Sequence, residues 1–83
     1  PEPEILSPYR LGVMIEKTLE EVVRPLLGQE GKGLELIDIK GFRVYCHLTG
    51  VDESDHRAEQ ALHMKVEQCL NEQVDQRLRV IVV

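Results

Sequence analysis

The sequence predicts an α+β fold, a two-layer α/β sandwich with two helices on one face of a small three-stranded mixed sheet. Three observations predict it. Apolar residues recur at helical spacing in two separate segments. Two runs of strand character follow the first segment and are joined by the turn Lys40-Gly41, and one more such run follows the second. The predicted order is therefore α-β-β-α-β, with a single domain over 8–83 and a flexible lead-in or linker end over 1–7.

The first helix is predicted to begin with Ser7 as its N-cap and Pro8 at its first position. Pro25 removes a backbone donor, so we expect the helix to kink or end near Arg24. The expected buried stripe, at spacings of four, four, three and four, is Leu11, Ile15, Leu19, Val22 and Leu26.

Two strands are predicted over 34–39 and 42–49, forming a β-hairpin. The second strand alternates strictly, which is typical of a strand with one packed face and one wet face. The expected packed face carries Val44, Cys46 and Leu48, and the expected wet face carries Arg43, Tyr45, His47 and Thr49.

The second helix follows a loop over 51–55 that offers several N-caps, and it is expected to fade around Glu72. A last strand is predicted over 78–83, with either Ile81 and Val83 or Val80 and Val82 pointing away from the helices. The expected stripe of the second helix comprises Ala58, Leu62, Val66, Cys69 and Gln73, widened by Ala61, Met64 and Leu70.

Composition and charge narrow the classes of partner. Fifteen acidic residues against ten basic ones give a net charge of -5, which argues against a nucleic-acid partner because phosphates need a basic face. No apolar run approaches the roughly 20 residues that a membrane span needs. A domain of 83 residues has a thin core, so a homodimer interface or a neighbouring module is an expected source of further burial.

Few residues of this sequence form a chemical motif. Cys46 and Cys69 are too far apart for a CxxC site, and we interpret them as two buried free thiols in a reducing compartment. No nucleophile stands beside a base in a recognisable element, so we expect no catalytic residue and no enzyme.

His56, Glu59 and His63 share one flank of the second helix with the acids Asp52 and Asp55. This flank is either a weak divalent-metal site or, as we favour, a solvated face with capping acids.

The remaining exposed side chains are better candidates for binding a partner protein than for catalysis or metal binding. Tyr45 and His47 lie on the expected wet face of the sheet, and Tyr45 is the stronger candidate because tyrosine is enriched at interfaces. Ile81 adds apolar surface to the same open face. Asp52 and Asp55 offer an acidic loop as a further candidate contact.

A family resemblance emerges from several short motifs in one register. Arg24-Pro25-Leu26-Leu27, Glu30-Gly31 and Leu34-Glu35-Leu36-Ile37-Asp38-Ile39 resemble the C-terminal domain of NifU-type iron–sulfur scaffold proteins. Leu48-Thr49-Gly50 is similar to the end of that domain's second strand. Leu62, Val66, Glu67 and Leu70 match its second helix, and the resemblance covers about residues 15–83.

The departures from this family concern its cluster ligands. In the family, a CxxC after the second strand supplies two thiolates, and two subunits together hold a bridging 4Fe–4S cluster. Asp52 and Asp55 stand at those two positions here, and hard carboxylates do not replace thiolates on iron. Lys32 also replaces a glycine, Ala61 replaces a threonine, and about one extra residue lies between Leu19 and Arg24.

The resemblance implies a NifU-like domain without cluster ligands and without a bound cofactor. We expect an accessory or protein-interaction module in iron–sulfur cluster assembly or transfer, placed in the cytoplasm or the plastid stroma. The implied partner is a cluster-carrying NifU-like module or an apo iron–sulfur acceptor. The alternatives are an acidic protein-interaction domain unrelated to cluster chemistry and the weak divalent-metal-binding domain described above.

Overall fold

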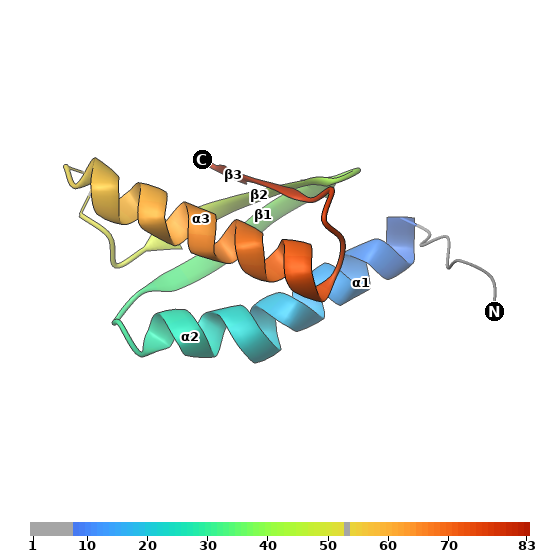
Figure 1. Cartoon of the computed structure of the whole chain (residues 1–83), viewed down its shortest axis with the longest axis horizontal. Coiled ribbons are helices and arrows are strands. Elements are labelled where there is room, and N and C mark those ends of the chain that lie inside the picture. The colour runs from blue at the N-terminus through green and yellow to red at the C-terminus, as the bar shows by residue number, and fades with distance from the viewer. Residues whose placement is uncertain (1–7, 53) are drawn as a thin grey trace.

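The computed structural model describes residues 8–52 and 54–83. The element order is α-β-β-α-β as predicted, with the first helix divided into three consecutive segments. Figure 1 shows this helix running alongside α3. The lead-in over 1–7, with the predicted N-cap Ser7, lies outside the described residues. The elements are α1 (Pro8–Thr18), η1 (Leu19–Val23), α2 (Arg24–Gly28), β1 (Gly33–Lys40), β2 (Arg43–Thr49), α3 (His56–Gln73) and β3 (Arg79–Val82).

The sheet is mixed, with the strand order β1-β2-β3. β1 runs antiparallel to β2 through a tight turn at Gly41, whose φ of 58° suits glycine. β2 runs parallel to β3, and α3 provides the crossover between them. The predicted α+β class and mixed sheet are therefore confirmed.

A β-bulge in β1 decides which of its side chains reach the core. The pairing shifts between Leu36 and Asp38, so Ile37 is the extra residue. Strict alternation from Leu34 and Leu36 would place the Asp38 carboxylate among apolar side chains, at a high desolvation cost. The bulge places Ile39 there instead, and Asp38 stays exposed.

The core lies between the helices and one face of the sheet. Val44, Cys46 and Leu48 are buried, as the alternation of β2 predicts. Val80 is buried and Val82 packs against the core, which leaves Ile81 on the open face and Val83 exposed. Of the two orientations left open for the last strand, this is the one with Val80 and Val82 inward.

The first helix departs from its predicted stripe after Leu19. Val23 and Leu27 are fully buried, while Val22 and Leu26 are each 38% exposed. The cause is the π-helical segment Leu19–Val23, where the Arg24 N–H reaches back five residues to the Leu19 carbonyl. The extra residue in this turn rotates the following residues about the helix axis, so Val23 and Leu27 lie on the buried side of the helix. The position agrees with the extra residue inferred between Leu19 and Arg24 from the family resemblance.

Pro25 was predicted to kink or to end the helix near Arg24, and the second of these outcomes is wrong. α2 continues through it from Arg24 to Gly28, with the proline at the start of that segment. The proline removes one backbone donor directly after the π-helical segment, where the regular pattern of bonds to the residue four positions back is already interrupted. The helix ends instead at Gly28, before the turn that carries Gly31 with a φ of 71°.

α3 begins at His56, with Asp55 as the N-cap, and ends at Gln73, one residue beyond the predicted fading point. Leu62, Val66 and Leu70 are buried as predicted. Met64 is 66% exposed and Ala61 is also exposed, so the predicted widening of the stripe is wrong at both positions. The sheet is narrow and the first helix occupies the adjacent space, so only a thin line of α3 contacts the core.

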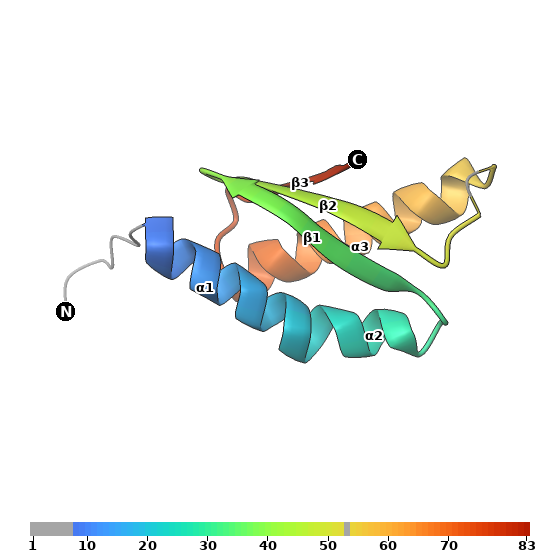
Figure 2. The ribbon, with the colours of Figure 1, turned by 180° about the vertical axis from the view of Figure 1, so that it is seen from behind.

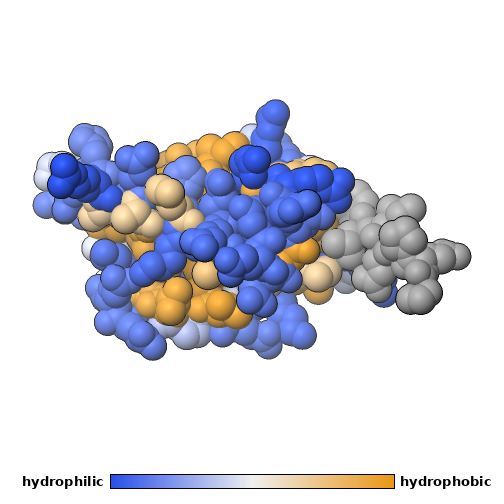
Figure 3. Space-filling view, in the orientation of Figure 1, coloured by the Kyte–Doolittle hydropathy of each residue, from blue (hydrophilic) through white to orange (hydrophobic). Residues whose placement is uncertain are grey.

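The outer surface of the helical layer is mostly polar. Figure 3 shows hydrophilic residues over the solvent side of α3, with apolar patches on both sides of them. In the described part of the chain, no helix combines the length and the apolar character that crossing a membrane requires.

Candidate functional site

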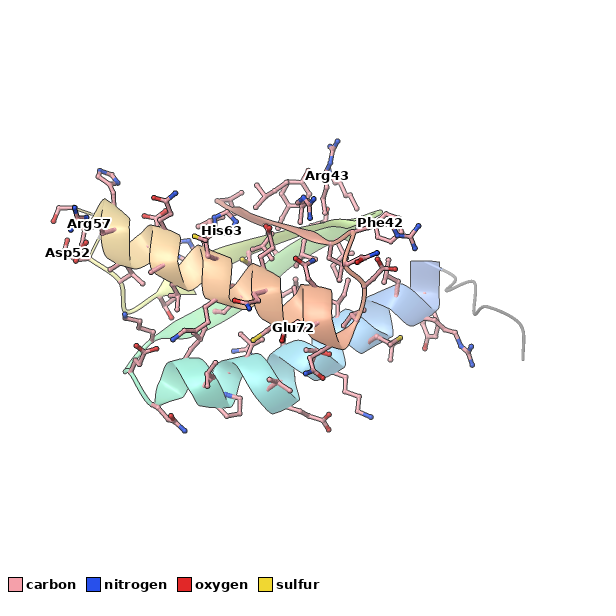
Figure 4. The ribbon with its side chains drawn as sticks, viewed as in Figure 1. Phe42, Arg43, Asp52, Arg57, His63 and Glu72 are labelled. Atoms are coloured by element: carbon pink, nitrogen blue, oxygen red, sulfur yellow. The ribbon has the colours of Figure 1, made fainter. Side chains whose placement is uncertain are left out.

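The loop between β2 and α3 is anchored by a close backbone contact. Gly50, with a φ of 78°, lies so near the α2–β1 turn that a Cβ atom would stand 2.5 Å from the carbonyl oxygen of Gly31. A side chain at position 50 therefore meets both backbone strain and a steric clash. This contact sets where the loop emerges and so places Asp52 and Asp55 at one end of the molecule, as Figure 4 shows for Asp52.

Both loop carboxylates are engaged in local hydrogen bonds. Asp52 Oδ1 accepts from the Ser54 backbone N–H at 2.9 Å and from the Ser54 hydroxyl at 2.8 Å. These bonds lower the pKa of Asp52, the backbone one most. Asp55 Oδ1 accepts from the Ala58 N–H at 3.1 Å, as a helix N-cap does. The two acids thus shape the loop and keep a negative charge exposed at its surface.

Neither cysteine lies at this loop. Cys46 is fully buried in the middle of β2, and burial raises the pKa of its thiol to about 11. Cys69 follows Asp55 by fourteen residues, which is about 20 Å along α3 at the usual helical rise. Its pKa is also raised, first by burial and then by Glu72, while Lys65 opposes the shift. Both thiols are free, but only Cys46 is buried as predicted, and Cys69 is partly exposed.

The donor set at the loop does not fit an iron–sulfur cluster. Iron in such clusters needs soft thiolates, whereas the described loop residues supply the hard oxygens of Asp52 and Asp55. Both carboxylates already accept hydrogen bonds from the loop itself. The two thiols stand elsewhere in the fold, with the pKa of each above its ordinary value. These residues therefore supply no site for the family's cluster.

The three candidate metal ligands of α3 are not brought together. His63 Nε2 bonds to the Val80 carbonyl, so it carries the proton and donates, because a carbonyl oxygen only accepts. His56 and Glu59 lie nearer the N-terminal end of α3. Over residues 8–52 and 54–83, no three His, Cys, Asp or Glu side chains are grouped as a metal site requires.

The predicted partner-binding residues of the sheet share its open face. Tyr45 and Ile81 are direct neighbours in the β2–β3 register, and both are partly exposed. Lys40 holds its ammonium 5.7 Å from the centre of the Tyr45 ring, a cation–π distance. His47 is exposed, and its Nδ1 donates to the Val83 carbonyl at 2.9 Å.

A hollow of about 330 Å³ lies where β2 runs into the loop. His47 and Thr49 line it from β2, Glu59 from α3, and Val82 from β3. The open face and the loop are thus neighbouring surfaces, joined by this hollow. A partner that contacts Tyr45 and Ile81 along the sheet meets His47 next and then the loop.

Two tertiary contacts were not predicted from the sequence. Glu67 Oε2 accepts from the Val80 backbone N–H at 3.0 Å, and Arg77 stacks 4.2 Å from the centre of the Phe42 ring. The spacing of four between His63 and Glu67 was the only available signal for the first contact. The second has no sequence signal, because Phe42 and Arg77 lie far apart in the chain.

Comparison with known proteins agrees with the fold and the motifs. A search of curated proteins finds no match to this chain. The model of the NifU-like domain family matches residues 15–81, which is most of the chain. The chain therefore belongs to the NifU-like domain family, a membership that indicates a role in iron–sulfur cluster biology and a protein partner.

Proposed function

We propose that this domain is a non-catalytic accessory module of iron–sulfur cluster assembly or transfer, and that it binds proteins and holds no cluster itself. The observation that carries the proposal is the chemistry of the loop. Asp52 and Asp55 stand where the family has its cysteines, and both are engaged in hydrogen bonds of the loop. Cys46 is buried and Cys69 lies far along α3, so neither thiol replaces the missing ligands.

The docking surface in this proposal is the open face with the adjacent loop. Tyr45 and Ile81 supply a partly exposed aromatic and aliphatic pair, which suits the centre of an interface. His47 and the exposed carboxylates of Asp52 and Asp55 supply a polar and acidic rim. The proposed partner is a cluster-carrying NifU-like module or an apo iron–sulfur acceptor, met in a reducing compartment.

Anaerobic reconstitution with iron and sulfide tests the cluster half of the proposal. We expect the chain to remain colourless, and the double variant Asp52→Cys/Asp55→Cys to gain a brown chromophore because it restores the family's ligand spacing. A matched control is Arg57→Cys/Gln60→Cys, which has the same spacing on an exposed part of α3 and should stay colourless. A stoichiometric chromophore in the unaltered chain, lost on Cys46→Ser, would overturn the proposal.

Calorimetric titration with a purified cluster-carrying NifU-like module and with an apo-ferredoxin tests the docking half. Binding should weaken about tenfold or more on Tyr45→Ala, in line with the cost of removing an aromatic anchor. Met64→Ala, at an exposed position of α3, should leave the affinity unchanged. If neither protein binds, the acidic interaction domain outside cluster chemistry becomes the better description.

A further inference from the structure

Positive charge gathers at one end of the open face of the sheet. Next to the β1–β2 turn, Lys40 lies opposite Arg43 in the antiparallel register, and Arg43 lies beside Arg79 in the parallel register. The next pair along, Val44 and Val80, is buried, so the preceding pair points to the other face. Lys40, Arg43 and Arg79 therefore form an exposed basic row on the open face, with one cation from each strand.

The opposite end of the same face is acidic. Figure 2 shows the β1–β2 turn at the other end of the sheet from the loop that leads into α3, and Figure 4 shows Arg43 pointing out from the sheet, away from the helices. Towards that loop, Glu35 is paired with His47, which stands about 13 Å along β2 from Arg43 at the usual rise. The open face therefore runs from basic to acidic, with the pair Tyr45 and Ile81 between the two ends.

The basic row is poorly compensated by acidic groups of the chain itself. Across residues 8–52 and 54–83, neither Arg43 nor Arg79 takes part in an ion pair. Arg79 Nη1 donates to the Leu78 carbonyl at 3.1 Å, which leaves its charge in place. Lys40 has one acid nearby, Asp38 Oδ2 at 3.9 Å, and an exposed pair of this length is weak.

Such a row opposes folding and suits an interface. Neighbouring strands are about 4.8 Å apart, and like charges directly beside one another on two strands are destabilising. The chain has fifteen acidic residues against ten basic ones, yet none of the acids in the described residues is paired with Arg43 or Arg79. Acidic groups of a partner would supply the missing negative charge.

We propose that the basic row binds an acidic segment of a partner protein, and that apolar side chains next to the acids pack on Tyr45 and Ile81. A carboxylate pairs with a planar guanidinium through two parallel hydrogen bonds, which Arg43 and Arg79 both offer. The acidic end of the face repels the same segment, so the partner docks in one orientation. This inference specifies the chemistry of the partner, and it rests on the open face named in the proposed function.

A second copy of this chain is a poorer occupant of the face. Three strands of four to eight residues cover roughly 14 Å by 20 Å, about 300 Å² in projection. A stable interface between folded proteins buries about 800 Å² on each partner. The face is therefore better matched to a short segment than to another folded domain.

Nucleic acid is also a poorer occupant. A nucleic-acid strand needs several phosphate contacts on a basic surface, whereas this chain has a net charge of -5 and its open face becomes acidic towards the loop. An acidic protein segment needs only the few cations of the basic row, together with the apolar pair beside them.

NMR titration with two synthetic peptides tests the proposal. Acetyl-Leu-Phe-Glu-Glu-Glu-amide should shift the backbone amide signals of Arg43, Tyr45, Arg79 and Ile81, with a Kd of about 1 mM or lower. The matching peptide with Lys in place of Glu should bind about tenfold more weakly or less tightly still. Added salt should weaken binding of the acidic peptide, because the charges are exposed.

One variant with a matched control locates the binding. Arg43→Glu places an acid between Lys40 and Arg79, so it should weaken binding of the acidic peptide about tenfold or more. It should also raise the urea midpoint of unfolding, since it removes the repulsion within the row. Arg57→Glu makes the same charge change on α3, near Asp52 in Figure 4, and should leave peptide binding unchanged.

Failure of this inference and failure of the proposed function give different results. If Arg43→Glu leaves peptide binding unchanged while Tyr45→Ala weakens binding of the NifU-like module, the face docks proteins and the basic row is not used. If the acidic peptide binds as expected and neither the module nor apo-ferredoxin does, the inference holds and the cluster role fails. Equal binding of both peptides, tighter binding of a single-stranded oligonucleotide, or a dimer that Arg43→Glu abolishes each contradicts the inference.

Discussion

The Glu67 carboxylate of α3 accepts a hydrogen bond of 3.0 Å from the backbone N–H of Val80, at the outer edge of β3. Val80 is 3% exposed, so water does not readily replace this acceptor. The bond connects α3 directly to the strand that follows it, and it constrains the position of β3 along α3.

Removing this acceptor should therefore destabilise the domain. Glu67→Ala leaves a buried N–H without a partner, which should lower the free energy of unfolding by about 1–3 kcal/mol. Glu67→Gln keeps an amide oxygen and should cost less. Urea unfolding measures both, with Gln68→Ala on the exposed side of α3 as the control. Equal stability of Glu67→Ala and this control would show that the bond contributes nothing.

The two thiols should differ in reactivity. Cys46 is fully buried with its pKa raised to about 11, so an alkylating reagent at neutral pH should modify only Cys69 in the folded chain and both thiols in urea. The readout is the number of labels per chain by mass spectrometry. Rapid labelling of Cys46 in the native state would contradict its buried position.

The same burial predicts the cost of a polar substitution at Cys46. Cys46→Ser places a hydroxyl in an apolar site without a partner and should lower the free energy of unfolding by about 1–3 kcal/mol. Cys69→Ser, at a half-buried position, should cost less when the two variants are compared by thermal unfolding. A larger loss at Cys69 would reverse the predicted order.

The π-helical segment should tolerate the loss of one residue. Deletion of Glu21 allows an unbroken α-helix in which the side chains of Val23 and Leu27 keep their buried places. In an unbroken α-helix, however, Pro25 would lie in the interior, where it costs about 3 kcal/mol, so the deletion is combined with Pro25→Ala. We expect the free energy of unfolding of this combined variant to stay within about 1 kcal/mol of the parent, because an exposed residue is lost and the core is kept. Circular dichroism with urea unfolding is the measurement.

Deletion of Gln68 from α3 is the control for that experiment. α3 contains no extra residue, so this deletion turns Leu70 and the end of the helix away from their contacts and should destabilise the domain strongly. Equal damage from both deletions would mean that the π turn is needed for the fold.

The stability of the domain should fall at low pH through Asp75. Hydrogen bonds from the Arg77 side chain and backbone lower the pKa of Asp75 from its ordinary value of 3.8 to about 2. Because the folded-state pKa is the lower one, the stabilisation is present above pH 3.8 and is lost as the pH falls toward 2. NMR titration of the Asp75 carboxyl measures the shift, and Arg77→Ala should return the pKa toward 3.8. An unchanged pKa in that variant would exclude the Arg77 side chain as the main cause, since the backbone N–H at position 77 is retained.

Much of the fold follows from local patterns. Alternation in β2 predicts its buried face correctly, and the helical spacing of Leu62 and Val66 predicts the inward face of α3. The predicted buried stripe of the first helix is wrong at Val22 and Leu26. The apolar residues around them fit an α-helical turn and a π-helical turn equally well, so the sequence does not distinguish the two. The predicted stripe of α3 is wrong at Met64 because the apolar character of a side chain does not reveal whether a neighbour is available to cover it.

The candidate site divides in the same way. The replacement of thiolates by carboxylates at Asp52 and Asp55 is visible in the sequence, as is the sharing of one face by Tyr45 and His47. The hydrogen bond of His63 to Val80 is not visible, since it joins residues that the crossover connection brings together. This contact gives a second role to a side chain that had been a candidate metal ligand.

The sequence by itself determined the order of the elements, the packed face of β2 and the donor chemistry of the loop, because each depends on residue type and short-range periodicity. Tertiary structure alone decided the rotation of the first helix after Leu19, the bulge at Ile37 and the hydrogen bonds from α3 to the outer edge of β3. These depend on how distant backbone segments satisfy their hydrogen bonds while burying apolar side chains. Local patterns do not contain that information.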